Sequence, residues 1–134
     1  MKPSAPPSVL LLITAFHIDH SKETVASVIV AINFFLGILC AALAIPLIQR
    51  RVPPNRLYGF RTPKTLRNES IWYQANAYAG KTLLLYGLTL SLTSLVLSPI
   101  YLWQPKLYIL FITMVALLGI GVILYFDFCY LNRL

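Results

Sequence analysis

The stretch TVASVIVAINFFLGILCAALAIPLI, Thr24 to Ile48, contains no charged residue from end to end. About 20 residues, each rising 1.5 Å, cross the hydrocarbon core of a bilayer, so this stretch predicts a transmembrane helix with some tilt. Pro46 stands close to its end, where a break in the helix costs little. The stretch therefore indicates that the chain is a membrane protein.

Two further apolar runs follow the first. One extends from about Gly80 to Leu102, and its only charge is Lys81 at the start. The other extends from Leu107 to Leu131, and its only charge is Asp127 near the end. Because lipid offers the backbone no hydrogen-bonding partner, we expect every run to be helical. The predicted fold is an all-α membrane protein with three transmembrane helices and a short interfacial helix before the second.

The composition supports this class of protein. The 134 residues are 58% hydrophobic and 11% charged, whereas about a quarter of the residues in a soluble domain are charged. We expect residues 24–134 to form a single three-helix transmembrane domain after an external N-terminal segment, residues 1–23. In that segment Val9 to Ile18 is apolar but too short to span. We interpret it as an interfacial or packing segment, or as a poorly ordered tail.

Basic residues concentrate between the first and second predicted spans, where Glu69 is the only acid. They are Arg50, Arg51, Arg56, Arg61, Lys64 and Arg67. The loop between the second and third spans, SPIYLWQPK, holds only Lys106. We expect a protein of the cell (inner) membrane, and the positive-inside rule predicts that the basic loop and the C-terminus lie in the cytoplasm and the N-terminus outside. Tyr101, Trp103 and Tyr108 are expected as interfacial anchors beside the outer loop.

The sequence contains no recognisable catalytic motif, because G-x-S-x-G, H-E-x-x-H and a Gly-rich phosphate loop are all missing. We therefore expect no enzymatic activity and no cofactor. The cluster from His17 to His20 has metal-ligating side chains, but a solvated turn is the favoured interpretation. Cys40 and Cys129 are expected as free thiols. The basic residues are too few and too close to the membrane to predict nucleic-acid binding, and anionic lipid headgroups are the expected partners.

The segment between the first two spans, residues 49–80, contains more than the positive charge that a loop needs. Its start, Val52-Pro-Pro-Asn55, predicts an extended chain, because residues before proline avoid the helical region. Gly59 lies between Tyr58 and Phe60 and is free to take a positive φ.

Two helix starts follow in the same segment. Thr62 and Pro63 have the pattern of an N-cap followed by proline at the first helical position. Asn68 is a second possible N-cap. Trp72 and Asn76 then lie on one helix face with Gly80, because they recur at every fourth position. The spacing predicts an interfacial helix that leads into the second span.

These residues together resemble the signature of the SdpI family, small bacterial membrane proteins named for an immunity protein against a secreted peptide toxin. The family pattern is N-x-x-[IYF]-G-[FY]-R-T, followed by a Trp, an Asn and a Gly-Lys pair. The residues of this chain that carry the resemblance are Asn55, Tyr58, Gly59, Phe60, Arg61, Thr62, Pro63, Ser70, Trp72, Asn76, Gly80 and Lys81. The resemblance covers residues 52–81 closely and the three-span plan loosely, since the named immunity protein is longer and has extra spans.

The resemblance implies protection against a membrane-active peptide toxin, by binding it or shielding its target. Two other functions remain open from the residues themselves. Three short spans without a catalytic set also suit an accessory subunit of a larger membrane complex. A small transporter or sensor would need a homo-oligomer, because three spans are too few for a usual transport path.

Two charges are expected at similar depth in the membrane, Lys81 at the start of the second span and Asp127 at the end of the third. Because a charge at the membrane edge is costly unless it is paired, we predict that Asp127 has a basic partner, either Lys81 or Arg61. A structural role is the favoured interpretation. The alternative is a pocket for a small anionic or peptidic ligand, formed by Arg61, Trp72 and Asn76.

A stripe of small residues follows one face of the second span, and small residues let helices approach closely in lipid. The stripe consists of Gly80, Gly87, Ser91, Ser94 and Ser98. It is expected to meet Gly37, Ala41 and Ala44 of the first span, and Gly119 and Gly121 of the third. Asn33, in the middle of the first span, is predicted to form a hydrogen bond across helices.

Overall fold

The computed structural model describes the backbone of residues 7–134 and the side chains of residues 24, 25 and 27–134. The helices are α1 (Pro7–Ile48), α2 (Pro63–Arg67), α3 (Glu69–Val96), α4 (Ser98–Trp103) and α5 (Pro105–Arg133). No strand occurs within residues 7–134. Ser27–Ile48 of α1, together with α3 and α5, is long and apolar enough to cross a membrane. The chain is therefore an all-α, multi-pass membrane protein, as the sequence predicts.

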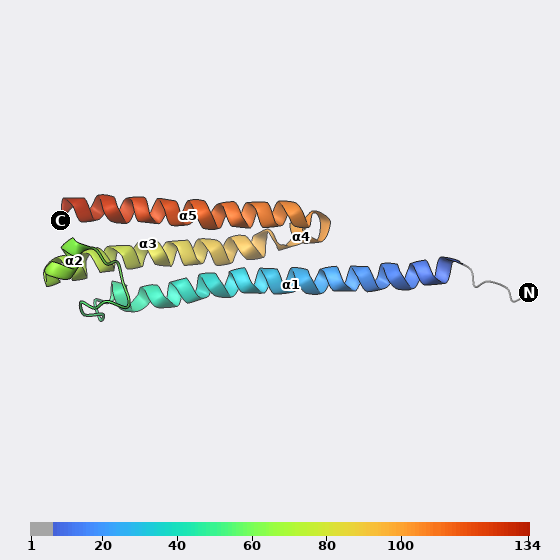
Figure 1. Cartoon of the computed structure of the whole chain (residues 1–134), viewed down its shortest axis with the longest axis horizontal. Helices are drawn as coiled ribbons and strands as arrows, with labels where there is room; N and C mark the ends of the chain where they lie inside the picture. The colour runs from blue at the N-terminus through green and yellow to red at the C-terminus, as the bar shows by residue number, and fades with distance from the viewer. Residues whose placement is uncertain (1–6) are drawn as a thin grey trace, which may run out of the picture.

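The three long helices lie side by side, and α3 lies between α1 and α5 (Figure 1). The loop after α1, helix α2 and the C-terminus gather at one end, and α4 lies at the other (Figure 1). We call the first of these the basic end, because it carries Arg50, Arg51, Arg56, Arg61, Lys64, Arg67 and Arg133. The topology thus separates these seven basic residues from Lys106 and from the start of α1.

Helix α1 is longer than the first predicted span. It continues without a break from Pro7 to Ile48 and projects past α4 (Figure 1). At 1.5 Å per residue its length is about 63 Å, roughly twice the hydrocarbon thickness. The apolar run from Val9 to Ile18 therefore extends the helix and is not a separate packing segment. The side chains of His17 to His20 lie outside the described residues.

The second span begins and ends earlier than predicted. Helix α3 starts directly after its N-cap, Asn68, whose side chain accepts a hydrogen bond from the backbone N–H of Ile71. It ends at Val96, before Ser98 and Pro99 start the short helix α4. The expected interfacial helix is reduced to the five residues of α2. The turns that carry Trp72 and Asn76 are continuous with the span itself, because nothing interrupts the backbone ladder between residues 69 and 96.

The small-residue stripe of α3 faces α1, as predicted. A Cβ added to Gly87 would stand 2.4 Å from the carbonyl oxygen of Gly37, so the two backbones are in direct contact. Ser91 donates from Oγ to the carbonyl of Phe34 at 2.9 Å. Ser94 donates likewise to the carbonyl of Val30 at 2.9 Å. These hydroxyl bonds and the close approach of the two backbones join α1 to α3.

On the other side of α3, the ring of Tyr86 packs over Gly119 of α5. A Cβ on Gly119 would lie 2.5 Å from this ring, and the Tyr86 hydroxyl donates to the carbonyl of Ala116 at 3.2 Å. The expectation that the stripe meets Gly119 and Gly121 was wrong for both, because Gly119 contacts Tyr86, which is outside the stripe, and a Cβ on Gly121 would meet nothing within 4 Å. Only one of the two α5 glycines therefore belongs to the helix contact.

Three predicted polar and aromatic roles differ in the structure. Asn33 donates to the carbonyl of Ile29 in its own helix at 2.9 Å, where a bond across helices was expected. Tyr101 and Tyr108 are buried against each other in an edge-to-face contact, with centroids 5.5 Å apart. They are core residues, because the turn at α4 folds both rings inward. Trp103 is 85% exposed, which fits the expected interfacial anchor.

The contact between α1 and α3 predicts a large effect of one methyl group. Gly87→Ala should lower the free energy of unfolding by about 1–3 kcal/mol, because its Cβ would collide with the backbone of Gly37. The measurement is reversible denaturation in detergent micelles. Gly121→Ala is the matched control and should be neutral or slightly stabilising, since its Cβ meets open space. Equal stability of the two variants would contradict the close helix contact.

Candidate functional site at the basic end

The loop from residue 49 to residue 62 begins with a helix cap of unusual composition. The N–H of Arg51 donates to the carbonyl of Pro46 at 3.0 Å, and that of Arg50 to Leu47 at 3.1 Å. This is the Schellman arrangement, in which the residue in the left-handed conformation is usually glycine. Here it is Arg50, with a φ of 55°. A left-handed L-residue costs about 1–2 kcal/mol, so this arginine stands where glycine would be more stable.

Asn55 and Gly59 shape the middle of the loop. The Oδ1 of Asn55 accepts from the backbone N–H groups of Leu57 and Tyr58, both at 2.8 Å, which forms the turn expected of Asn55. Gly59 has a φ of +114°, and a Cβ there would lie 2.4 Å from Oδ1 of Asn76. Only glycine satisfies both the backbone angle and the close approach.

Asn76 and Trp72 attach this loop to α3. The N–H of Phe60 donates to Oδ1 of Asn76 at 2.6 Å, and Nδ2 of Asn76 donates to the carbonyls of Trp72 at 3.0 Å and of Phe60 at 3.4 Å. The indole Nε1 of Trp72 donates to the carbonyl of Val52 at 2.8 Å. The exposed fractions are 0% for Trp72 and 2% for Asn76. Both side chains are therefore buried with their polar atoms paired to the loop backbone.

This geometry corrects the predicted ligand pocket of Arg61, Trp72 and Asn76. Trp72 and Asn76 are covered by the loop and do not line an open cavity. Arg61 is exposed, and its guanidinium donates to the carbonyl of Arg56 within the loop. The three residues thus serve one loop but do not form one binding site.

Helix α2 connects the same loop to α5. The hydroxyl of Thr62 accepts from the N–H of Thr65, and the Thr65 hydroxyl accepts from the N–H of Thr62, so the predicted N-cap is a reciprocal capping box. Lys64 donates from Nζ to the carbonyl of Leu131 near the end of α5, at 2.9 Å. The ring of Phe60 also contacts Phe128 edge to face at 5.2 Å. The loop is therefore attached to both α3 and α5.

Asp127 has a different partner from the predicted one. Its Oδ1 accepts from the hydroxyl of Thr82 at 2.8 Å, and the side chain is buried. It forms no ion pair with Lys81, Arg61 or any other residue whose side chain the structure describes. Successive residues of a helix point about 100° apart, so Thr82 faces α5 while Lys81 faces a neighbouring cavity.

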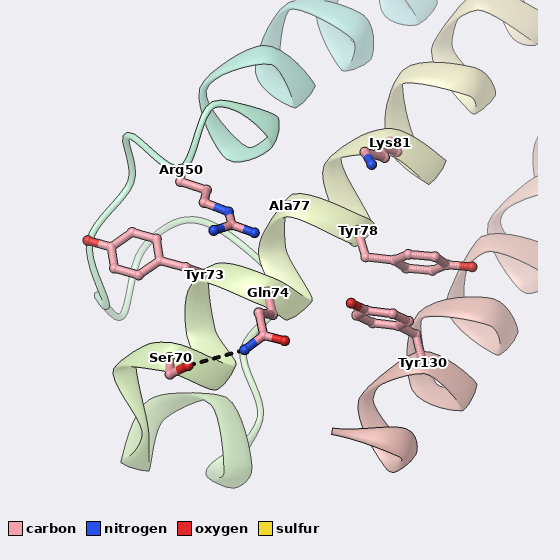
Figure 2. Close-up of a pocket in the computed structure, with 8 residues that line it drawn as sticks. All are labelled: Arg50, Ser70, Tyr73, Gln74, Ala77, Tyr78, Lys81 and Tyr130. Atoms are coloured by element: carbon pink, nitrogen blue, oxygen red, sulfur yellow. Dashed lines mark hydrogen bonds between the residues drawn. The ribbon is translucent and has the colours of Figure 1, made fainter.

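That cavity, of about 350 Å³, is the polar hollow of the basic end. Figure 2 shows the residues that line it: Arg50, Ser70, Tyr73, Gln74, Ala77, Tyr78, Lys81 and Tyr130. Gln74 donates to the hydroxyl of Ser70 at 3.1 Å. The rings of Tyr78 and Tyr130 are stacked, with centroids 4.1 Å apart and planes at 6°. The cavity thus combines two cations with several hydrogen-bonding side chains.

Of these lining residues, the sequence analysis singled out Lys81 alone as a candidate. A signal for the others existed, because Ser70, Tyr73, Gln74, Ala77 and Tyr78 share one face of α3 with Lys81. No local pattern, however, places Arg50 or Tyr130 beside that face. Arg50 lies beside that face because of the cap of α1, and Tyr130 because the end of α5 packs on α3.

The side chain of Tyr58 contributes packing and no hydrogen bond. Its hydroxyl oxygen is buried, and within the described part of the chain it has no hydrogen-bonding partner. Burial raises the pKa of the Tyr58 phenol. The hydroxyl is therefore a cost to the folded state and not part of the attachment of the loop.

We expect Asn76→Ala to release the loop. The substitution leaves the N–H of Phe60 without its partner and removes one of the two donors to the Phe60 carbonyl, which should lower the free energy of unfolding by about 1–3 kcal/mol. Trypsin should then cleave after Arg56 and Arg61 faster than in the unmodified protein. Asn132→Ala removes an exposed amide from the same end and is the control. Unchanged cleavage in Asn76→Ala would show that the loop is held by other contacts.

Tyr58→Phe should match the unmodified protein in stability or exceed it by about 1 kcal/mol, because an unpaired hydroxyl is removed. The raised pKa means that the folded state keeps the phenolic proton to a higher pH than the unfolded chain does. Stability is therefore lost as the pH rises above about 10, and Tyr58→Phe should lack that part of the loss. Denaturation between pH 8 and pH 11 measures this, with the exposed Tyr125→Phe as control. A destabilised Tyr58→Phe would indicate a partner for the hydroxyl.

A model of the SdpI/YfhL protein family matches residues 51–126 of the chain. The match includes the loop, α2, α3 and most of α5, and it begins at the end of the α1 cap. Searches of curated proteins and of solved structures find no significant match.

Proposed function

The chain belongs to the SdpI/YfhL protein family, and on this premise we propose that it protects a bacterial cell against a membrane-active peptide toxin. We propose a binding role, in which the protein captures the peptide or shields the toxin's target. No catalytic step is part of the proposal.

We call the loop from residue 49 to residue 62 the signature loop. Its attachment to α3 is the observation that carries the proposal. The indole of Trp72 donates to the loop carbonyl of Val52, and the carboxamide of Asn76 bonds to the N–H and the carbonyl of Phe60 in the loop. The side chains of Arg56, Leu57 and Arg61 remain exposed, and Leu57 is 90% exposed. A fixed loop with an apolar tip between two arginines is a suitable surface for a peptide that itself partitions between water and membrane.

The distribution of charge supports an orientation. The basic end holds seven of the chain's arginines and lysines outside the spans, and Lys106 is near the opposite end. The positive-inside rule therefore favours an inner-membrane protein whose basic end faces the cytoplasm. In that orientation the signature loop would meet a toxin that has already entered or crossed the bilayer.

One structural feature favours a second function, that of an accessory subunit in a larger membrane complex. Helix α1 projects well beyond α4, so part of it has no neighbour within residues 7–134 (Figure 1). A projecting helix is a natural contact for a further subunit. Constant partners in a sized particle extracted with mild detergent would support this function over a stand-alone protective one.

The protective function predicts resistance in a toxin-sensitive bacterium that expresses the chain. Arg61→Ala should lower survival under challenge with a secreted membrane-active peptide by about tenfold, because it removes an exposed cation that the fold uses only for one contact within the loop. Survival is counted as colonies at a fixed toxin dose.

Arg67→Ala is the matched control, since Arg67 is an exposed arginine at the end of α2. It should leave survival unchanged. Membrane levels of all variants must be equal by immunoblot. No protection by the unmodified chain against a panel of such peptides would overturn the proposed function.

A further inference from the structure

We propose that the cavity between the end of α1, the start of α3 and the end of α5 binds a phosphate group. The phosphate belongs either to the headgroup of an anionic lipid or to a free phosphate ion. This site differs from the exposed tip of the signature loop, and it stands whether or not the chain protects against a toxin.

The charge in the cavity is positive and uncompensated. Arg50 and Lys81 both line it, and no acidic side chain does. Neither cation forms an ion pair with a residue whose side chain is described. Among those residues the acids are Glu69 and Asp127, and Asp127 is buried against Thr82. Two cations at one hollow repel each other unless an anion lies between them.

The remaining walls supply neutral hydrogen-bonding groups. In Figure 2 the guanidinium of Arg50 extends over α3 at Ala77, and the hydroxyl of Tyr130 points toward Gln74. The small side chain of Ala77 leaves the space between the Arg50 guanidinium and the Tyr130 hydroxyl open. A phosphate oxygen accepts several hydrogen bonds, and a planar guanidinium matches two of its oxygens at once. The donors of Arg50, Lys81, Gln74 and Tyr130 therefore fit a phosphate better than a neutral ligand.

The backbone of Arg50 is a second, independent observation. A residue that ends a helix in the left-handed conformation is usually glycine, yet here it is the arginine whose guanidinium reaches into the cavity. Strained residues of this kind concentrate at functional sites, because the strained backbone holds the side chain in the position that the function needs.

The position of the cavity along α3 suits a headgroup. From Glu69 to Lys81 the helix carries polar and aromatic residues, and from Thr82 to Val96 it carries no charge. The cavity thus lies where the polar part of the helix meets the apolar part. The stacked rings of Tyr78 and Tyr130 form one wall at this level, where tyrosine is enriched in membrane proteins. In a bilayer, lipid phosphates lie at such a boundary between the apolar core and water.

The test uses the full chain, purified in a neutral maltoside detergent without phosphate buffer. Isothermal titration measures the binding of three probes: inorganic phosphate, dioctanoyl phosphatidylglycerol and dioctanoyl phosphatidylcholine. We expect one site for phosphatidylglycerol or phosphate, and at least tenfold weaker binding of the zwitterionic phosphatidylcholine. Tighter binding of phosphatidylglycerol than of phosphate identifies a lipid headgroup as the source, and equal affinities identify free phosphate. Both results support the site.

Four variants locate the binding. Arg50→Gln and Lys81→Gln should each weaken binding about tenfold, whereas Arg67→Gln, which removes a cation outside the cavity, should change it less than twofold. Arg50→Gly should bind about tenfold more weakly while unfolding at the same or a higher temperature, because glycine suits the left-handed cap. This last variant separates lost binding from lost folding.

Two results would overturn the proposal. One is the absence of measurable binding of both phosphate and phosphatidylglycerol to the unmodified protein. The other is binding through the acyl chains alone. It would show as equal effects of Arg50→Gln, Lys81→Gln and Arg67→Gln, and as equal binding of phosphatidylcholine and phosphatidylglycerol. Survival under toxin challenge, measured on the same variants, reports the proposed protective function separately.

Discussion

The carboxamide of Asn76 accepts from the N–H of Phe60 and donates back to the carbonyls of Phe60 and Trp72. A buried backbone group without a partner costs about 1–3 kcal/mol, so this side chain makes it possible for an extended loop to lie against a helix. The close approach requires the missing Cβ of Gly59. The contact holds the loop against α3, and the side chains of Arg56 and Arg61 remain exposed on that loop.

The helix contacts depend on a related constraint. In lipid there is little hydrophobic attraction between apolar helices, so association relies on close packing and on hydrogen bonds between helices. Helix α3 meets that requirement on both sides. It approaches α1 through Gly37 and Gly87, with hydroxyl bonds from Ser91 and Ser94, and it contacts α5 through Tyr86 and Thr82. The signature loop is thus attached to the most constrained helix of the molecule.

The sequence by itself determined the class of fold and most of the local structure. Uncharged runs of membrane-spanning length leave no alternative to helices, because every backbone group must be paired within its own segment. The N-caps at Thr62 and Asn68 and the positive φ at Gly59 depend on short-range chemistry, and all three were predictable for that reason. The small-residue stripe of α3 was predictable from helical periodicity.

Only the tertiary structure decided which side chains meet. Sequence distance does not state whether Lys81 or Thr82 faces Asp127, since a single position rotates a side chain by about 100°. Periodicity likewise placed Trp72 and Asn76 on one face without showing that the loop covers it. The cavity is the clearest case, because Arg50 and Tyr130 are 80 positions apart and reach Lys81 only through the cap of α1 and the packing of α5 on α3. Contacts of this kind arise from the relative placement of helices, which no local pattern encodes.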